Sequence, residues 1–198
     1  ENMLYKIEGN KKIKIKAIPY GYDIRSGKVR INSLYDEPLI EISHEVLPQW
    51  EANMKRFIDV TISLFVIIVF FPLFLIIAIG VKIDSKGTVF YSHERIGKGR
   101  KPFNIFKFRT MFPGSEKYGP ALAQEQDKRV TSFGRILRKW RLDELPQFFN
   151  VLIGDMSIVG PRPERRFFID QIMIKAPHYN HLHKVKPGIT SLGQVKYG

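Results

Sequence analysis

The most hydrophobic part of the chain, residues 57–83, sets the pattern around which the other elements are arranged. From Val60 to Val81 it contains 22 residues without a charged side chain. A helix of that length would be roughly 33 Å long, enough to cross the hydrocarbon core of a bilayer. Pro72 lies near its middle, where the missing N–H and the ring clash break or kink a helix. The pattern therefore predicts two apolar helices separated by a break at Pro72.

Basic side chains lie at both ends of this uncharged run: Lys55 and Arg56 precede it, and Lys82 and Lys86 follow it. Positively charged residues that flank membrane segments favour the cytoplasmic side. Charge at both ends therefore favours a re-entrant hairpin, which enters and leaves the membrane by one face, over a single span. A buried helix of a soluble core is a weaker alternative, because core helices rarely lack a polar face over this length.

Shorter patterns predict the elements that follow. Apolar and polar residues alternate on either side of a glycine-rich turn within 88–111, which predicts a β-hairpin. Residues 132–140 and 164–174 have the spacing of amphipathic helices. The first carries Trp140 and a basic face, which favours a membrane interface, although a core-packed surface helix has the same pattern. These elements predict a helix-dominated α+β fold with a small hairpin and interfacial helices.

Residues 1–49 have a different pattern and no cluster of candidate catalytic residues. Isoleucine and lysine nearly alternate within 11–20, and a second apolar run covers 38–42. Both patterns are typical of strands. We expect residues 1–49 to be the tail of a preceding α/β domain with a linker, and residues 50–198 to form the main domain.

Composition narrows the classes of partner. With 198 residues and 44% hydrophobic content, the chain is not wholly disordered and has enough apolar residues for a packed core. Its net charge of +13 indicates an anionic partner, which would be nucleic acid, a phospholipid surface or a phosphorylated substrate. The absence of cysteine excludes disulfides and thiolate metal sites.

The candidate chemistry centres on two adjacent carboxylates, Asp143 and Glu144. They precede an apolar repeat with helical spacing that ends at Gly154, and Pro146 suits the first turn of that helix. We therefore expect Asp143 to be its N-cap, and the local pattern alone is typical of a simple cap. The alternative is functional: a carboxylate near a helix N-terminus that binds phosphate can act as a nucleophile or hold a cation.

Other charged residues extend this candidate site. Asp155, with Asp143 and Glu144, would offer oxygen ligands for Mg²⁺. Arg162 lies between two prolines, which would present its guanidinium rigidly to phosphate oxygens. Further candidates for phosphate binding, for which a solvated surface charge is equally typical, are Arg95, Lys107, Arg109 and Lys186.

Several separated motifs occur in an order that resembles one family. The motifs are Lys55-Arg56 with Asp59, Lys107 to Met111, Leu142 to Leu145, Asn150 to Leu152, Gly154 to Ser157, Val159 to Pro163 and Lys186 to Thr190. Together they resemble the bacterial sugar transferases, the monotopic phosphoglycosyl transferases that start glycoconjugate assembly on polyprenyl phosphate. The match begins near Lys55 and runs to the end of the chain, and it favours the functional interpretation of Asp143 and Glu144 over the simple cap.

The resemblance implies transfer of a sugar 1-phosphate from a UDP-sugar to undecaprenyl phosphate, with Mg²⁺ as cofactor and release of UMP. It implies a covalent phosphosugar on Asp143, a metal-binding or proton-handling role for Glu144 and a phosphate contact for Arg162. It also implies attachment to the cytoplasmic face of the bacterial inner membrane. Residues 1–49 would then be the end of a nucleotide-fold-like domain, and the chain a C-terminal portion of a larger member.

A rival from another class is a non-catalytic scaffold that uses the apolar hairpin and basic helices to bind anionic membrane lipids. Such a module would not need the adjacent acids. Nucleic-acid binding is disfavoured, because no recognisable binding module is present and the apolar segment favours lipid. The sequence does not determine the sugar, and it leaves a homo-oligomer open.

Overall fold

The computed structural model describes residues 15–17, 40–42, 48–115 and 127–197, and the chain divides into two compact units, 1–49 and 50–198. In the first unit, the described residues form strands β1 (Ile15–Ala17) and β2 (Ile40–Ile42). These strands pair antiparallel, with Ile15 opposite Ile42. The remainder of the expected strand within 11–20 lies outside the described residues, and the expected α/β domain stays a prediction.

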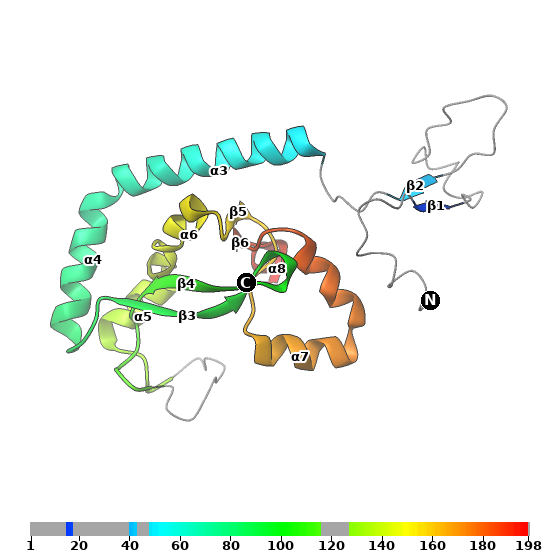
Figure 1. Ribbon diagram of the computed structural model, residues 1–198. Helices are drawn as coiled ribbons and strands as arrows, with labels where there is room; N and C mark the ends of the chain where they lie inside the picture. The colour runs from blue at the N-terminus through cyan, green and yellow to red at the C-terminus, as the bar shows by residue number, and fades with distance from the viewer. Residues whose placement is uncertain (1–14, 18–39, 43–47, 116–126, 198) are drawn as a thin grey trace. The chain divides into compact units, whose positions relative to one another are not determined.

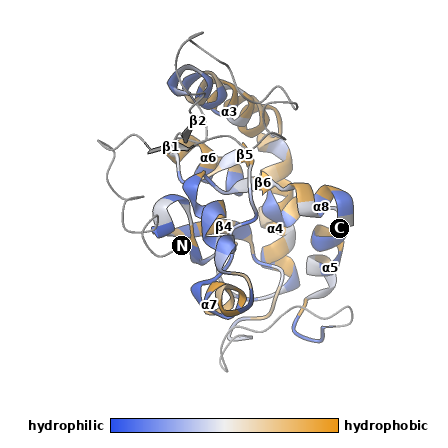
Figure 2. Cartoon of the chain, turned by 90° about the vertical axis from the view of Figure 1, so that its right-hand side faces the viewer, coloured by the Kyte–Doolittle hydropathy of each residue, from blue (hydrophilic) through white to orange (hydrophobic). Residues whose placement is uncertain are grey.

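The apolar stretch forms two helices, α3 (Gln49–Val69) and α4 (Phe71–Asp84), with a bend of 63° between them. Pro72 lies in the first turn of α4, where its missing N–H is tolerated, so the predicted break at this proline is confirmed. Among the described residues no individual helix is both long and apolar enough for a membrane crossing, whereas the bent α3–α4 pair is when taken together. Figures 1 and 2 show the bend and the hydrophobic residues along both helices.

The predicted hairpin is also confirmed. Strands β3 (Phe90–Ile96) and β4 (Pro102–Phe108) pair antiparallel, with Phe90 opposite Phe108. The short helix η1 (Lys98–Arg100) forms the turn, in which Gly99 and Arg100 have φ values of 66° and 60°. Gly99 therefore suits this turn, because glycine adopts a positive φ without steric strain.

A hydrophobic cluster joins α4, the hairpin and the predicted amphipathic helix, which is α5 (Ser132–Lys139). Thr131 caps α5 by accepting a hydrogen bond from the Gly134 N–H at 3.0 Å. The buried members of the cluster are Phe74, Ile77, Val81, Phe108 and Leu137. This packing holds one face of α4 against the domain and leaves five of its large apolar side chains exposed, namely Phe71, Leu75, Ile76, Ile79 and Ile83.

Short elements complete the second unit. They are η2 (Leu142–Glu144), α6 (Gln147–Ile153), β5 (Ser157–Val159), α7 (Arg166–Lys175), η3 (Pro177–Lys184), β6 (Gly188–Thr190) and α8 (Leu192–Tyr197). Strands β5 and β6 pair in parallel. A second buried cluster, Ile105, Val151 and Met156, joins β4 to α6 and to the start of β5. The described residues of the second unit are thus mainly helical.

The expected N-cap role of Asp143 is wrong. Asp143 lies inside the 3₁₀ turn η2, and α6 begins only at Gln147, after Pro146, without a side-chain cap. An N-cap residue has extended dihedral angles, but Leu145 and Pro146 already have helical ones. The turn therefore continues into α6, and the Asp143 carboxylate does not cap it.

Polar contacts attach the first half of α3 to the domain. The Asp59 carboxylate accepts hydrogen bonds from Ser157 Oγ at 2.8 Å and from the Ile158 N–H at 3.1 Å. Lys55 forms an ion pair with Asp59 and also donates to Ser157 Oγ. Arg56 donates to the carbonyl oxygens of Val151 and Leu152, at the C-terminal end of α6. We call this set of contacts the α3–β5 junction.

Candidate active site

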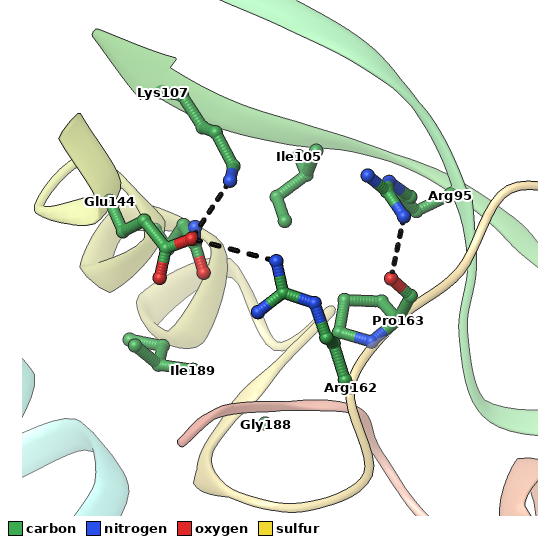
Figure 3. Close-up of a pocket in the computed structure, with 9 residues that line it drawn as sticks. Arg95, Ile105, Lys107, Glu144, Arg162, Pro163, Gly188 and Ile189 are labelled. Carbon is green, nitrogen blue, oxygen red and sulfur yellow. Dashed lines mark hydrogen bonds and ion pairs between the residues drawn. The ribbon is translucent and has the colours of Figure 1, made fainter. Parts of the chain in front are cut away.

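A small pocket lies where the hairpin, η2, α6, β6 and the segment after β5 meet (Figure 3). Its lining contains three cationic side chains, one carboxylate and one amide. The lining residues are Arg95, Ile105, Lys107, Glu144, Gln147, Arg162, Pro163, Gly188 and Ile189. Residues that the sequence predicted as separate candidates are thus brought together, namely Arg95, Lys107, Glu144 and Arg162.

The two adjacent acids are buried. Asp143 is 7% exposed and Glu144 is 9% exposed. The leucines on either side, Leu142 and Leu145, pack against the cluster formed by α4, α5 and the hairpin. This packing fixes the turn, so both carboxylates are held on a rigid part of the domain.

Three cations surround the Glu144 carboxylate. Lys107 Nζ lies 2.9 Å from Glu144 Oε1, Arg141 Nη1 lies 3.7 Å away and Arg162 Nη2 lies 3.9 Å away. Figure 3 shows Lys107 and Arg162 approaching the carboxylate from different elements. Burial disfavours the anion, but Lys107, Arg162 and Arg141 outweigh burial and lower the pKa of Glu144. Glu144 is therefore a fixed anion.

Asp143 is shifted in the opposite direction. Burial raises its pKa, and the neighbouring Glu144 charge raises it further, although Lys107 opposes both effects. Within the described ranges, no ion pair within 4 Å reaches its carboxylate. Of the two acids, Asp143 is the one that holds a proton more readily, and its carboxylate is less tied to other side chains.

The two pocket arginines are held differently. Arg95 donates to His93 Nε2 at 2.8 Å, to the Pro163 carbonyl at 2.9 Å and to Glu164 at 2.8 Å. Burial lowers the pKa of Arg95, while Glu164 opposes that effect. Arg162 is 40% exposed and lies 3.9 Å from Glu144 and 3.8 Å from Glu164. Arg95 thus fixes the Pro163 segment to β3, and the Arg162 head is held only by long contacts.

Asn150 aligns the acids with Lys107. Its side chain is fully buried, accepts a hydrogen bond from the Phe106 N–H at 2.9 Å and donates to the Asn104 carbonyl at 2.7 Å. These bonds join α6 to β4 on either side of Ile105. They set the position of η2 relative to Lys107, which directly follows Phe106 in β4.

Close backbone contact between Gly160 and Gly188 positions the Arg162 segment. The Gly188 N–H donates to the Pro161 carbonyl at 2.9 Å, and the Gly160 N–H donates to the Thr190 carbonyl at 3.1 Å. A Cβ on either glycine would overlap the backbone of the other segment. The two segments therefore require glycine at both positions to form this wall of the pocket.

Asp143 does not itself line the pocket, although its neighbour Glu144 does, and three further predicted site residues lie elsewhere. Arg109 is 7% exposed and donates to the Ser85 carbonyl at 2.7 Å, so its guanidinium binds the C-terminal end of α4. Lys186 lies beside Gly154 and Arg56, and its pKa is lowered by burial and by the charge of Arg56. Asp155 acts electrostatically on Lys186. None of these three residues lines the pocket.

The donor set fits Mg²⁺ only in part. In residues 48–115 and 127–197, no three Asp, Glu or His side chains are grouped for a metal. The structure therefore does not group Asp155 with the two acids. Mg²⁺ is, however, commonly bound by one or two carboxylates together with substrate phosphates and water. Asp143 and Glu144 fit that smaller set, which a phosphorylated substrate would complete.

Sequence reasoning did not identify Gln147 as a lining residue, and it named Asn150 and Asp59 only as members of motifs, without a role. Gln147 and Asn150 are buried polar residues within an otherwise apolar helical repeat, and this interruption is the signal that could have identified them. Asp59 is 5% exposed, and its single negative charge at the start of an apolar stretch is a comparable signal. Buried polar groups of this kind require partners, which the pattern alone does not reveal.

The structure thus combines a bent apolar helix pair, a buried acid pair and a cationic pocket. Comparison with known sequences identifies the class of protein to which these features belong. Residues 50–198 match the bacterial sugar transferases. The chain belongs to the bacterial sugar transferase family.

Its relatives act on different sugars. One is the UDP-N-acetylgalactosamine-undecaprenyl-phosphate N-acetylgalactosaminephosphotransferase of Aeromonas hydrophila, 43% identical over 87% of this chain and 40% of the relative. Two are UDP-glucose:undecaprenyl-phosphate glucose-1-phosphate transferases. That of Klebsiella pneumoniae is 41% identical over 84% of this chain and 34% of the relative. That of Caulobacter vibrioides is 42% identical over 76% of this chain and 57% of the relative. The chain thus spans about a third to somewhat over half of these relatives.

Proposed function

We propose that the protein is a phosphoglycosyl transferase that moves a sugar 1-phosphate from a UDP-sugar to undecaprenyl phosphate and releases UMP. The observation that carries the proposal is the buried Asp143–Glu144 pair, of which Glu144 lines a cationic pocket. Family membership and the names of the relatives support the same general reaction. Such a reaction would be the first membrane step of glycoconjugate synthesis, as in O-antigen, capsule or exopolysaccharide assembly.

The proposed chemistry has two displacements at one phosphorus. The Asp143 carboxylate attacks the phosphorus that bears the sugar, and the bond from that phosphorus to the bridging oxygen breaks, so that UMP leaves. An oxygen of undecaprenyl phosphate then attacks the same phosphorus, breaks the acyl phosphate bond and regenerates Asp143. A nucleophile that forms a covalent intermediate in this way gives ping-pong kinetics.

The pocket side chains have distinct roles in this scheme. Glu144 remains ionised and holds Lys107 at 2.9 Å, close to Asp143. Lys107 thereby favours the ionised nucleophile and neutralises charge on the diphosphate. The loosely held Arg162 is free to turn from Glu144 and Glu164 toward a phosphate oxygen. Mg²⁺, held by Asp143 and Glu144 with the substrate phosphates, would supply further neutralisation of the diphosphate.

Turnover tests this function against the rival lipid-binding scaffold. UMP release is measured with each of a panel of UDP-sugars, with undecaprenyl phosphate and Mg²⁺ present. We expect release with at least one UDP-sugar, loss of release on chelation and recovery when Mg²⁺ is restored. A scaffold would release no UMP with any sugar, and activity that survives thorough chelation would contradict the Mg²⁺ assignment.

We further propose that α3 and α4 form a re-entrant hairpin at the cytoplasmic face of the bacterial inner membrane. Their outer side chains are apolar and exposed, including Phe65 (63%), Ile68 (64%), Ile76 (64%) and Ile83 (82%). Burying such side chains in lipid stabilises the complex by about 1.5–3 kcal/mol each. Anionic lipids would attract the basic residues that flank the hairpin.

Site-directed labelling tests the topology, because the sequence contains no cysteine to interfere. Single cysteines replace Asn53, before the apolar run, and Ser85, after α4. We expect both to react with a membrane-impermeant thiol reagent only from the cytoplasmic side. Reaction from opposite sides would show a single span. In that case the hairpin assignment is wrong, while the proposed chemistry is untouched.

A further inference from the structure

Gln147 is the one pocket residue whose hydrogen-bonding capacity is unused among the described residues. It is the first residue of α6, is 3% exposed and lines the pocket. No hydrogen bond joins its amide to any side chain or backbone group of residues 48–115 or 127–197. Its amide nitrogen and oxygen are nevertheless not completely inaccessible to solvent. Buried polar groups in folded proteins usually have a hydrogen-bond partner, so an unpaired amide that lines a pocket is available to a group that enters it.

The position of Gln147 places it beside the reacting groups. It follows Glu144 by three residues and Asp143 by four, and the intervening backbone is helical at Leu145 and Pro146. In a 3₁₀ turn, side chains three positions apart lie on the same face, which aligns Gln147 with Glu144, whereas Asp143 does not line the pocket. Glu144 and Gln147 indeed line the same pocket, and Lys107 and Arg162 line it with them.

The other polar groups of the pocket already have partners. Lys107 is paired with Glu144, Arg95 with Glu164 and the Pro163 carbonyl, and Arg162 lies between two carboxylates. The amide of Gln147 is uncharged and has two N–H donors. A group that enters the pocket therefore meets one neutral donor that needs no existing bond to be broken.

We propose that the Gln147 amide donates a hydrogen bond to a non-bridging oxygen of the phosphorus that Asp143 attacks. This assignment rests on the proposed function. The phosphoryl group is the one part of the substrate that is present in both displacements, and its oxygens accept but do not donate. A donor directed at them stabilises the charge that develops in each transition state. Gln147 would therefore act in both half-reactions and with every sugar.

The test uses Gln147→Met, which keeps the length of the side chain and removes the donor. The first half-reaction is followed as adduct formation by intact-protein mass, with UDP-sugar but no lipid acceptor. The second is followed as discharge of that adduct by undecaprenyl phosphate. We expect both rates to fall by about 10²-fold, the usual cost of one such donor. The Tm should not fall, because no hydrogen bond within the described protein is lost.

Two further variants sharpen the test. Gln147→Glu keeps the shape but places a carboxylate near Glu144 and the phosphoryl oxygens, so it should slow both half-reactions more than Gln147→Met does. Gln171→Met changes an exposed glutamine on α7 that does not line the pocket, and it should leave both rates within twofold.

Each other outcome overturns the assignment. Rates within twofold of the parent in Gln147→Met would remove Gln147 from the reaction. A Tm lowered by several degrees would make its role structural. A rate loss that differs between UDP-sugars would move the contact from the phosphoryl group to the sugar. If the parent itself forms no adduct and releases no UMP, the proposed function fails and this assignment fails with it, whereas an active parent with an unaffected variant refutes only Gln147.

Discussion

The two walls of the pocket differ in how firmly their charged groups are held. On the acid wall, the side chains of Glu144 and Lys107 alone are 11% and 17% exposed, and Lys107 Nζ lies 2.9 Å from Glu144 Oε1. On the arginine wall, Arg162 is 40% exposed, and its closest acidic oxygens are 3.8 and 3.9 Å away. The first wall has the geometry of a preformed electrostatic site, and the second has a side chain that can change its partner.

This difference matches the two demands of group transfer. Charge stabilisation is most effective when the stabilising groups are fixed before the reaction. Entry and exit of a bulky substrate require groups that move. The backbone of the arginine wall is nevertheless fixed, because Arg95 binds the Pro163 carbonyl and the Ile96 N–H donates to the Glu164 carbonyl at 3.0 Å. On this wall, the guanidinium of Arg162 is the group that can change its position.

The largest expected effect comes from the acid wall. Asp143→Asn keeps the shape of the side chain but removes the anionic oxygen, so we expect activity to fall on the order of 10⁴-fold or more. The variant should remain folded, because neutralising a buried acid relieves its desolvation. The measurement is intact-protein mass after brief incubation with UDP-sugar and Mg²⁺ but no lipid acceptor, in which the parent should carry the phosphosugar and the variant should not.

Glu144→Gln is the matched control for this prediction. It should impair turnover but leave Asp143, the proposed nucleophile, so some adduct should still form. An adduct that persists in Asp143→Asn would move the nucleophile to another residue. The absence of an adduct from every form, with sequential kinetics, would instead indicate direct attack by the lipid phosphate.

Lys107→Met should have the next largest effect. It removes the closest cation from both acids, and we expect kcat/KM to fall by about 10²- to 10³-fold. Lys107 lowers the pKa of Asp143, so its loss raises that pKa further. In the proposed reaction, activity needs ionised Asp143 and is lost as the pH falls through its pKa, so the acid limb of the kcat/KM profile should move to higher pH.

The pH profile of Arg162→Met provides the comparison. Arg162 acts on Glu144, so its removal should shift the acid limb less than the removal of Lys107 does. Equal shifts of the acid limb in the two variants would show that Lys107 and Arg162 act equally on the pKa of Asp143.

Arg162→Lys should have a smaller effect, confined to the adaptable wall. Lysine keeps the charge but lacks the planar fork that binds two phosphate oxygens. We expect kcat/KM to fall by about 10- to 100-fold. The Tm should change little, since the contacts of Arg162 are long and partly exposed. Steady-state kinetics and a thermal melt of the same preparation check both parts, and a large fall in Tm would show that this wall is rigid too.

The smallest effect on activity is expected from Arg109→Lys. Arg109 lies two residues after Lys107, but its guanidinium binds Ser85 at the end of α4 rather than lining the pocket. The Tm should fall by several degrees, whereas the KM for the UDP-sugar should stay within about twofold because binding groups are untouched. A large rise in KM with an unchanged Tm would restore Arg109 as a phosphate-binding residue.

Features that depend on local pattern were predictable from the sequence. The break at Pro72, the hairpin and helix α5 follow from the covalent limits of proline and from residue periodicity. The pairing of Lys107 with Glu144, 37 residues apart, did not follow from any such period. Motif resemblance suggested that both residues belong to one site, but the contact itself depends on tertiary packing.

The errors also have physical causes. The expected cap at Asp143 was wrong because a proline can follow a continuous helical turn as well as begin a new helix. For Arg109 the sequence left a phosphate contact and a surface charge equally open, because charge alone does not predict the bond that its guanidinium donates to the Ser85 carbonyl. Asn150 was named within a motif but without a role, since that role requires two backbone groups of β4 that only the folded chain supplies.

The α3–β5 junction has a consequence for the order of folding. Its contacts join residues 95 to 102 positions apart in the chain, including Arg56 to Val151 and Asp59 to Ile158. Contacts of such separation form late, because a long loop must close before they are gained. During synthesis α3 leaves the ribosome well before Ser157 does. The polar contacts of the junction can therefore form only after the segment that contains Ser157 and Ile158 has been synthesised.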